Sequence, residues 1–301
     1  MDLSLYQDTI SEKIERICDI LIQTNKISTL RDHLSFYGGT ALNFLYLNVP
    51  RLSEDLDFNY RQVNSQDWGE VRNDIDIETK RILYDLGYHR ESIKIQPMYN
   101  LCRFYIEYIN SKNLKDLIKI ETGYMRRIPI LKNDTFKEFI HPVTGQHIDI
   151  KTPQKEELFA NKFCTMFSRE SMSVRDIFDV YNISKAEFEF SLFCDVVMIE
   201  SIFMNIDIMN FSLTSLDEKM QMDRIQDFVA GEIDWTAINE GVKSFVMRIQ
   251  AELKVRDHPK LIREFHKSKT INIDQIINKS KLNDGIQEHP ILLWIIEEIS
   301  K

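Results

Sequence analysis

The sequence predicts an α+β fold, in which a mixed sheet flanked by helices is followed by a mainly helical C-terminal half. Up to about residue 150, short segments rich in Ile, Tyr and Phe alternate with helical patterns. Beyond that point helical spacing dominates, with no β-rich segment and no fixed-period repeat. We therefore expect an α/β domain over residues 1–150 and a helical domain over residues 151–301 that completes a cleft.

The composition is that of an ordinary globular protein, with 301 residues, 43% hydrophobic and 28% charged. A formal net charge of −9 argues against wholesale wrapping of nucleic acid, although a local basic patch is compatible with it. The four cysteines form no CxxC pair and are expected to be buried free thiols. No signal peptide or membrane-spanning run is evident, so a cytoplasmic protein without membrane contact is expected.

Four elements are predicted before residue 61. Apolar residues at helical spacing predict a first helix. A short apolar run that ends in Gly-Gly predicts a strand, and alternating apolar and polar residues predict a second strand after an intervening helix. Thr40 is placed to cap that intervening helix, which Pro50 prevents from continuing. The expected ranges are Leu5–Leu30 (helix), Leu34–Tyr37 (strand), Ala41–Leu47 (helix) and Glu54–Tyr60 (strand).

The remainder of the first half is predicted as a helix followed by strands. Gly87 closes the helix, and Gly145 forms the turn of a last strand pair. Thr152 and Pro153 are expected to cap and open the long helix of the second half. The expected ranges are Ser65–Leu86 (helix), Ile93–Met98, Leu101–Tyr108 and Leu117–Tyr124 (strands), and Phe139–Ile150 (strand, turn and strand).

The stretch from Phe36 to Phe58 combines a glycine turn with two closely spaced carboxylates. Gly38 and Gly39 allow the backbone to approach a ligand, and the following helix N-terminus offers free N–H groups to a phosphate. Asp55 and Asp57 are two residues apart on a predicted strand, so they face the same side. A hard divalent cation such as Mg²⁺ would neutralise such a pair. The stretch therefore indicates phosphoryl or nucleotidyl transfer.

Gly38-Gly39-Thr40 followed by Arg51-x-Ser53-x-Asp55-x-Asp57-Phe58 resembles the AbiEii-like nucleotidyltransferase toxins, a branch of the DNA polymerase β-type superfamily. The resemblance covers roughly residues 34–182. It implies the nucleotidyltransferase fold, Mg²⁺ at Asp55 and Asp57, and nucleotide binding by the Gly-Gly-Thr turn. Thr40 stands where many members of the superfamily have Ser. Arg51 and Ser53 have either a structural or a phosphate-adjacent role.

A two-metal site needs a third carboxylate on a neighbouring strand. Glu121 is the candidate, because it shares a strand face with Lys119 and the family has an acid in a similar Lys-x-Glu context. An exposed Lys–Glu edge face is the alternative, and Asp116 is the fallback acid.

A second motif follows in the helical half. Lys162 and Arg169 are seven residues apart on one helix face, and Asp176 and Asp179 are three apart on the next. A salt-bridged helix pair would explain this pattern. The family resemblance implies instead that Lys162 contacts nucleotide phosphates and that Asp176 is catalytic. Asp179 would orient Arg175 or serve the structure.

Two basic segments are candidates for binding a nucleic acid such as an RNA end. The segment Lys254–Lys269 holds six Lys and Arg residues against two acids, and Arg126-Arg127 is a smaller patch. A solvated helix face is the plainer explanation of the longer segment.

The expected function is a Mg²⁺-dependent nucleotidyltransferase that moves a nucleotide from an NTP to an acceptor hydroxyl. The resemblance implies the toxin of a bacterial toxin–antitoxin or phage-defence system, with RNA, and above all the tRNA 3′ end, as the acceptor and an antitoxin protein as a possible partner. The alternatives are transfer to an aminoglycoside-like small molecule or a protein side chain, and a non-catalytic NTP-binding module.

Overall fold

The computed structural model describes residues 1–61, 68–169, 172–211, 220–221, 225–268 and 279–300. The chain forms two compact units. The first consists of Met1–Ile128, Asp134–Pro153 and Asp227–Ala230, and the second of Pro129–Asn133, Gln154–Gln226 and Gly231–Lys301. The predicted α+β class is confirmed. The boundary near residue 150, as a division between independently folding domains, stays a prediction.

The first unit contains the helices and strands that surround the glycine turn. The helices are α1 (Asp8–Lys26), α2 (Ser28–His33), α3 (Gly38–Leu45) and α4 (Trp68–Asp85), with short 3₁₀ turns at Leu3–Leu5 and Arg90–Ser92. The strands are β1 (Leu34–Tyr37), β2 (Asp55–Tyr60), β3 (Ile93–Pro97), β4 (Leu101–Ile109), β5 (Lys115–Gly123), β6 (Thr135–Ile140) and β7 (His147–Thr152).

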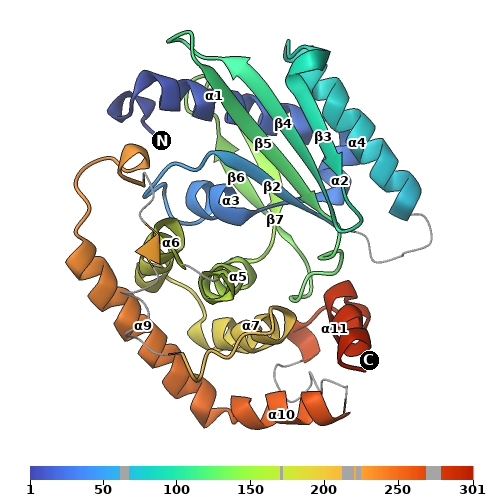
Figure 1. The fold of residues 1–301 in the computed structure, drawn as a ribbon, viewed down its shortest axis with the longest axis vertical. Helices are drawn as coiled ribbons and strands as arrows, with labels where there is room; N and C mark the ends of the chain where they lie inside the picture. Colours follow the sequence, from blue (N-terminus) through green and yellow to red (C-terminus); the bar gives the residue numbers. More distant parts are fainter. Residues whose placement is uncertain (62–67, 170–171, 212–219, 222–224, 269–278, 301) are drawn as a thin grey trace. The chain divides into compact units, whose positions relative to one another are not determined.

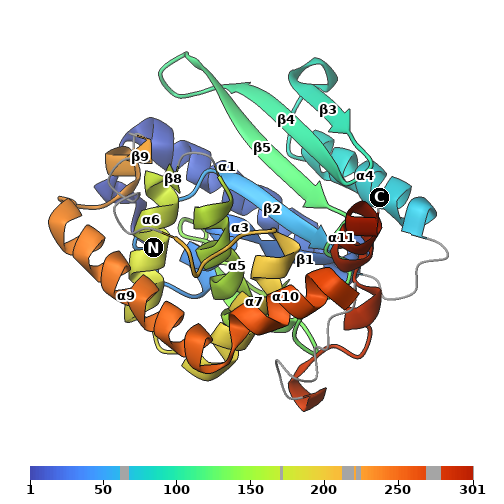
Figure 2. The same ribbon diagram turned by 60° about the horizontal axis from the view of Figure 1, so that its bottom comes forward.

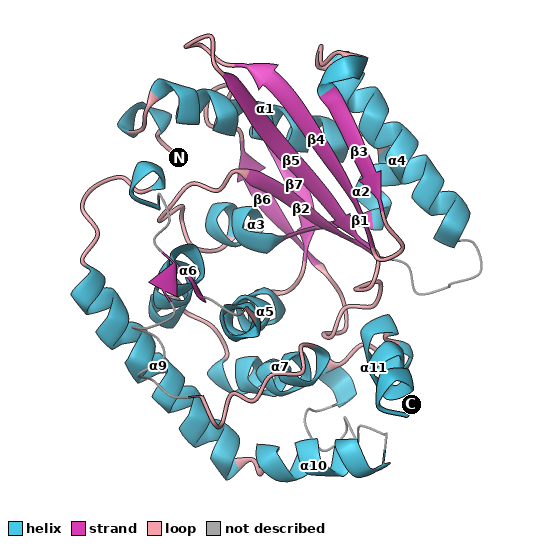
Figure 3. Ribbon diagram, viewed as in Figure 1, coloured by secondary structure: helices cyan, strands magenta, loops and turns pink. Residues whose placement is uncertain are grey.

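Five of these strands form one mixed sheet in the order β1-β2-β5-β4-β3 (Figures 1 and 3). The β2–β5 pair is parallel, whereas β1–β2, β5–β4 and β4–β3 are antiparallel. β6 and β7 form a separate antiparallel ribbon. Because β2 and β5 run side by side although more than fifty residues separate them in the sequence, a motif on β2 acquires neighbours that its own segment does not contain.

The two faces of the five-stranded sheet differ in burial. On β4 and β5 the even-numbered residues, such as Phe104 and Ile120, are buried. Helix α4 packs toward this side, since Asp76 of α4 accepts a hydrogen bond from Tyr124 and Arg72 lies over the ring of Tyr124. In Figure 1, α1 passes behind β4 and β5, and in Figure 2, α4 passes behind β3. The odd-numbered residues therefore form the more open face.

Three local predictions about this unit require correction. The single helix over Leu5–Leu30 is interrupted at Ile27, whose extended backbone separates α1 from α2. Thr40 does not cap a helix, because α3 already begins at Gly38 and Thr40 lies inside it. Thr152 and Pro153 do not open the long helix either. Thr152 is the last residue of β7, and Gln154 precedes α5 (Lys155–Ser168) without a side-chain cap.

The other predicted elements of this unit are present with shifted ends. The helix predicted from Ser65 is described from Trp68, and its residues 65–67 lie outside the described residues. Gly87 ends α4 with a φ of +87°, and its backbone N–H donates to Tyr84. Gly145 has a φ of +68° in the turn between β6 and β7.

The second unit is mainly helical, as predicted. Besides α5 its helices are α6 (Val174–Lys185), α7 (Phe190–Phe203), α9 (Trp235–Val255), α10 (His258–Ser268) and α11 (Pro290–Ser300). Two very short strands, β8 (Met172–Ser173) and β9 (Met220–Gln221), pair in parallel. The 3₁₀ turns are Ile225–Phe228, which spans both units, Lys279–Lys281 and Ile286–Glu288.

An aromatic cluster forms the core of the second unit. Phe163 of α5, Phe193 of α7 and Phe245 of α9 lie with ring centroids 5.8–6.0 Å apart. Their burial joins three helices that are distant in sequence. All four cysteines of the chain are buried and free, as predicted. Among the residues that the structure describes, no helix is both long and apolar enough to cross a bilayer.

Candidate active site

Asp55 and Asp57 lie on β2 with their side chains on the open face of the sheet. Between and beyond them, Leu56 and Phe58 are buried on the opposite face. This alternation is the one expected of a strand with one side against a core. The two carboxylates therefore share a face, as the sequence predicted.

The glycine turn meets the second carboxylate directly. Tyr37, the last residue of β1, is the cross-strand partner of Asp57, and Gly38 follows with a φ of +75°. A Cβ built on Gly38 would overlap the carboxylate of Asp57. Both the backbone angle and the available space therefore require glycine at residue 38.

Residues between the turn and the carboxylate strand lie against the second glycine. A Cβ at Gly39 would lie 3.1 Å from the guanidinium of Arg51 and 3.2 Å from Oγ of Ser53. Arg51 is 3% exposed and donates to the backbone carbonyl of Leu52. The Thr40 hydroxyl is fully buried and donates to the backbone carbonyl of Asp55, so it ties α3 to the start of β2.

Glu121 is the direct neighbour of Asp57 across the parallel β2–β5 ladder. It also shares the open face with Lys119, as predicted, because Ile118 and Ile120 are buried on the other side. The fallback acid Asp116 has the opposite parity on β5. Its carboxylate accepts from Lys13 at 3.1 Å and from the Tyr108 hydroxyl at 3.1 Å. The structure thus brings Glu121, and not Asp116, next to the Asp pair.

Two cations on the same face contact these acids: Lys119, which the sequence placed on the face of Glu121 without a role at the site, and Arg103, which the sequence did not single out. Lys119 Nζ lies 3.2 Å from Oδ2 of Asp55, and Arg103 Nε of β4 donates to Oε2 of Glu121 at 2.6 Å. Burial by itself would lower the pKa of Lys119, but the nearby carboxylates of Asp55 and Asp57 outweigh it and raise that pKa above its ordinary value. Lys119 therefore remains charged at neutral pH. Arg103 could be found only from the strand register, because nothing near residue 103 marks it.

The acidic residues suit a hard divalent cation in ligand type, since Mg²⁺ prefers carboxylate oxygens. Their backbone positions suit it too, because Asp55, Asp57 and Glu121 occupy one face of two adjacent strands. Within the described residues, however, no three Asp, Glu, His or Cys side chains are gathered closely enough to share an ion. Asp55 and Glu121 instead hold Lys119 and Arg103. Metal binding would thus require side-chain rotation but no change in strand register.

The second predicted motif forms a compact ion-pair cluster within the second unit. Lys162 Nζ of α5 donates to Asp176 Oδ1 at 2.5 Å and lies 2.8 Å from Asp179 Oδ2, both on α6. Arg169 lies 3.3 Å from the other oxygen of Asp176. Asp176 and Asp179 are 2% and 0% exposed, so both charges depend on these cations for compensation.

The basic segment near α10 is partly neutralised within its own unit. Arg256 forms ion pairs with Asp195 and with Glu252, and Lys260 lies 3.9 Å from both Asp257 and Glu264. Lys269 lies outside the described residues. These pairs leave less positive charge for a polymer than the sequence count suggests.

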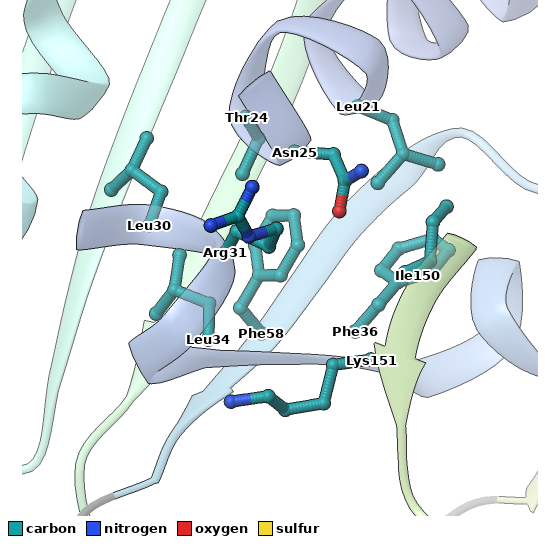
Figure 4. Close-up of a pocket in the computed structure, with 10 residues that line it drawn as sticks. All are labelled: Leu21, Thr24, Asn25, Leu30, Arg31, Leu34, Phe36, Phe58, Ile150 and Lys151. Atoms are coloured by element: carbon teal, nitrogen blue, oxygen red, sulfur yellow. The ribbon is translucent and has the colours of Figure 1, made fainter. Parts of the chain in front are cut away.

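A small pocket in the first unit lies on the other side of the sheet from the carboxylates. Its lining includes Phe36 of β1 and Phe58 of β2 (Figure 4). The alternation along β2 places Asp55 and Asp57 on the opposite face from Phe58. Its volume of about 20 Å³ suits a single water molecule and no nucleotide. It lies between α1, α2, the five-stranded sheet and β7.

A glycine turn that touches an Asp-x-Asp strand, with a third acid on the adjacent parallel strand, defines the nucleotidyltransferase class of folds. The family model described as "Nucleotidyl transferase AbiEii toxin, Type IV TA system" matches residues 19–264. The chain belongs to this AbiEii family of nucleotidyltransferase toxins from type IV toxin–antitoxin systems, which confirms the resemblance noted in the sequence.

Comparison with solved structures points to the same fold. The chain is similar to MenT4, nucleotidyltransferase toxin Rv2826c from Mycobacterium tuberculosis H37Rv, with a TM-score of 0.59 and 14% sequence identity. The match covers 97% of this chain and 93% of MenT4. No curated protein sequence matches the chain.

Proposed function

We propose that the protein transfers a nucleoside monophosphate from an NTP to the terminal hydroxyl of an RNA and releases pyrophosphate, with the tRNA 3′ end as the favoured acceptor. The observation that carries the proposal is the direct approach of Gly38 to Asp57, with Glu121 beside it. A phosphate-binding turn beside an acidic metal site suits a triphosphate that contacts both. The AbiEii membership supports the transfer of a nucleotide, and it supports an antitoxin protein as a partner.

The site residues of the first unit have distinct roles in this proposal. Gly38 and Gly39 leave room for a phosphate beside the backbone N–H groups at the start of α3. Asp55, Asp57 and Glu121 would hold Mg²⁺. When bound, the ion would neutralise the phosphates and activate the attacking hydroxyl. Thr40 fixes the turn to the strand, because its hydroxyl is bonded to the Asp55 carbonyl.

The roles of Lys162 and Asp176 are proposed from the family motif. Lys162 would contact the triphosphate, and Asp176 would assist catalysis. Both are held in one ion-pair cluster, so each substitution also tests a structural contribution. Activity must therefore be read together with stability for these two residues.

The deciding experiment combines the purified protein with Mg²⁺, each labelled NTP in turn, and separate acceptor pools. The pools are total tRNA, total protein and aminoglycosides. We expect label in tRNA, loss of label with EDTA, and loss of label in Asp57→Asn. Tyr84→Phe, a change on exposed α4, is the matched control and should retain activity.

Label in the protein or aminoglycoside pool would show that the acceptor is a protein or an aminoglycoside rather than RNA. Full transfer by Asp57→Asn or Asp55→Ala would contradict the site itself. Mg-NTP binding without transfer to any pool would indicate a binding module rather than an enzyme.

A further inference from the structure

We infer that the open face of β3, β4 and β5 binds the single-stranded end of the acceptor RNA and leads it to the carboxylates. This inference rests on the proposed function, because it assigns a path to the acceptor of the same reaction. It concerns Lys94, Gln96, Arg103, Tyr105 and Lys119, which we call the sheet-face strip.

The strand register arranges the sheet-face strip in two rows. In the first row Lys94 of β3, Tyr105 of β4, Lys119 of β5 and Asp55 of β2 are successive cross-strand partners. In the second row the partners are Gln96, Arg103, Glu121 and Asp57. Each row therefore crosses four strands and ends on one of the two aspartates, over about 14 Å at the usual spacing of neighbouring strands.

The side chains of the strip are available to a ligand. Lys94 is 70% exposed on the edge strand β3, and the side chains of Arg103 and Lys119 are 31% and 30% exposed. Tyr105 is partly exposed on the same face. Lys94 pairs with Glu107 at 2.8 Å, but an exposed ion pair contributes little stability and exchanges readily for a phosphate.

The chemistry of the strip favours a single-stranded nucleic acid over other occupants. Tyr105 lies between two lysines in its row, so a base stacked on its ring would have a cation on either side for its phosphates. A duplex offers no free base face to such a ring. An end of the strand must also reach Asp55 and Asp57 if its terminal hydroxyl is to react, and both rows lead there.

The acidic residues of this face lie where the reaction needs them. Asp55, Asp57 and Glu121 gather at the β2 and β5 end of the rows, whereas Lys94 stands at the far end. Only Glu107 adds negative charge beside Lys94 on the described part of this face, and it is already paired. Each cation of the strip is paired with one of these acids: Lys94 with Glu107, Arg103 with Glu121 and Lys119 with Asp55. A phosphate would therefore displace Glu107 from the exposed Lys94, and Arg103 and Lys119 would become available when a metal takes up Glu121 and Asp55.

The test measures RNA binding directly, by fluorescence anisotropy with the full-length protein. The probes are an RNA hairpin with a short single-stranded 3′ end and the same hairpin with a blunt end. We expect tighter binding of the first probe. Tyr105→Ala should weaken it about tenfold, whereas Tyr105→Phe keeps the ring and should bind as wild type.

Charge changes give a second, independent readout. Lys94→Glu on the exposed edge should weaken binding of the overhang probe, and Lys94→Gln should reduce the slope of log affinity against log salt by about 0.7. The matched controls are Tyr84→Ala on α4 and Lys112→Gln in the β4–β5 turn, both exposed and outside the strip. The controls should not change RNA binding, and no variant should change Mg-NTP binding.

Equal binding of blunt and overhang hairpins by wild type would overturn the inference. So would undiminished overhang binding by both Tyr105→Ala and Lys94→Glu, with folding checked by thermal denaturation. Failure of the proposed function is visible separately. The protein could bind the overhang probe as expected and yet transfer no nucleotide to RNA. That result would support the RNA-binding strip and refute the proposed transfer to RNA.

Discussion

Asp57 and Glu121 are direct neighbours across the only parallel strand pair of the five-stranded sheet, between β2 and β5. On the other side of β2, Asp57 lies opposite Tyr37, so its carboxylate also borders the Gly38 turn. Asp57 therefore connects the turn proposed to bind phosphate with the carboxylates proposed to bind the metal.

Gly38→Ala should lose most transfer activity. An added methyl group overlaps the Asp57 carboxylate, and a φ of +75° costs a non-glycine residue roughly 1 kcal/mol. Gly145→Ala is the matched control, because it has a φ of +68° but nothing within 4 Å of its Cβ. Both variants should lose stability by urea denaturation because of the positive φ, Gly38→Ala the more because of the overlap with Asp57, and only Gly38→Ala should lose transfer by more than about tenfold. Equal activities would show that the turn does not position Asp57.

Thr40 offers a test of whether its hydroxyl serves structure or phosphate. Thr40→Val removes the buried hydrogen bond to the Asp55 carbonyl and should lower the free energy of unfolding by about 1–2 kcal/mol. Thr40→Ser keeps the hydroxyl and should retain both stability and activity. If Thr40→Val is as stable as wild type but has a raised KM for NTP, the hydroxyl acts on the phosphate instead.

The Lys162 cluster should contribute to stability. Asp179→Ala removes one of two carboxylates from Lys162 and opens a space where the side chain was fully buried, so we expect a loss of about 2–4 kcal/mol. Asp179→Asn keeps the shape and an acceptor oxygen, so its free energy of unfolding should fall by less. Lys162→Met removes the cation that contacts both buried carboxylates, Asp176 and Asp179, and should lower the free energy of unfolding at least as much. Chemical denaturation measures all three.

A wild-type free energy of unfolding in Lys162→Met, together with lost transfer, would assign Lys162 to the substrate alone. A large stability loss with proportionate loss of activity would instead support the salt-bridged helix pair. The sequence left these two interpretations open, and the observed ion pairs make the stability measurement necessary.

The stability of the second unit should depend on pH through Asp195. Burial raises the pKa of Asp195 to about 6, although Arg256 beside it acts in the opposite direction. Because this pKa exceeds the ordinary value of 3.8, the folded protein takes up the proton before the unfolded chain does as the pH falls. The stabilisation is complete below about pH 4 and is lost as the pH rises through about 6.

Thermal denaturation at pH 7 and pH 4.5 checks this prediction. Between pH 7 and pH 4.5, the free energy of unfolding of wild type should rise by about 1–2 kcal/mol relative to that of Asp195→Asn. The comparison with Asp195→Asn cancels the titration of other groups. An equal pH response of the two proteins would show that Asp195 titrates at its ordinary value.

Much of the fold followed from local pattern. Periodicity placed the helices and strands around the glycine turn, and Gly87 and Gly145 ended elements where predicted. The errors were at capping positions. Thr40 and Thr152 resemble caps in sequence, but Thr40 lies inside α3 with its hydroxyl bonded to the Asp55 carbonyl, and Thr152 pairs with Thr135 at the end of β7. Local hydrogen-bond preferences are weak compared with the burial that fixes a strand or helix end.

The sequence by itself determined the chemistry available to this protein, because Gly38, Gly39, Asp55 and Asp57 stand in one short segment whose spacing fixes their common face. The sequence also offered Glu121 as a third acid, but its register beside Asp57 and the positions of Lys119 and Arg103 were decided by the tertiary structure. Glu121, Lys119 and Arg103 reach that face through the β2–β5 and β5–β4 registers. Register depends on burying one face of each strand against helices far away in the chain, and no local pattern around residue 103 contains that information.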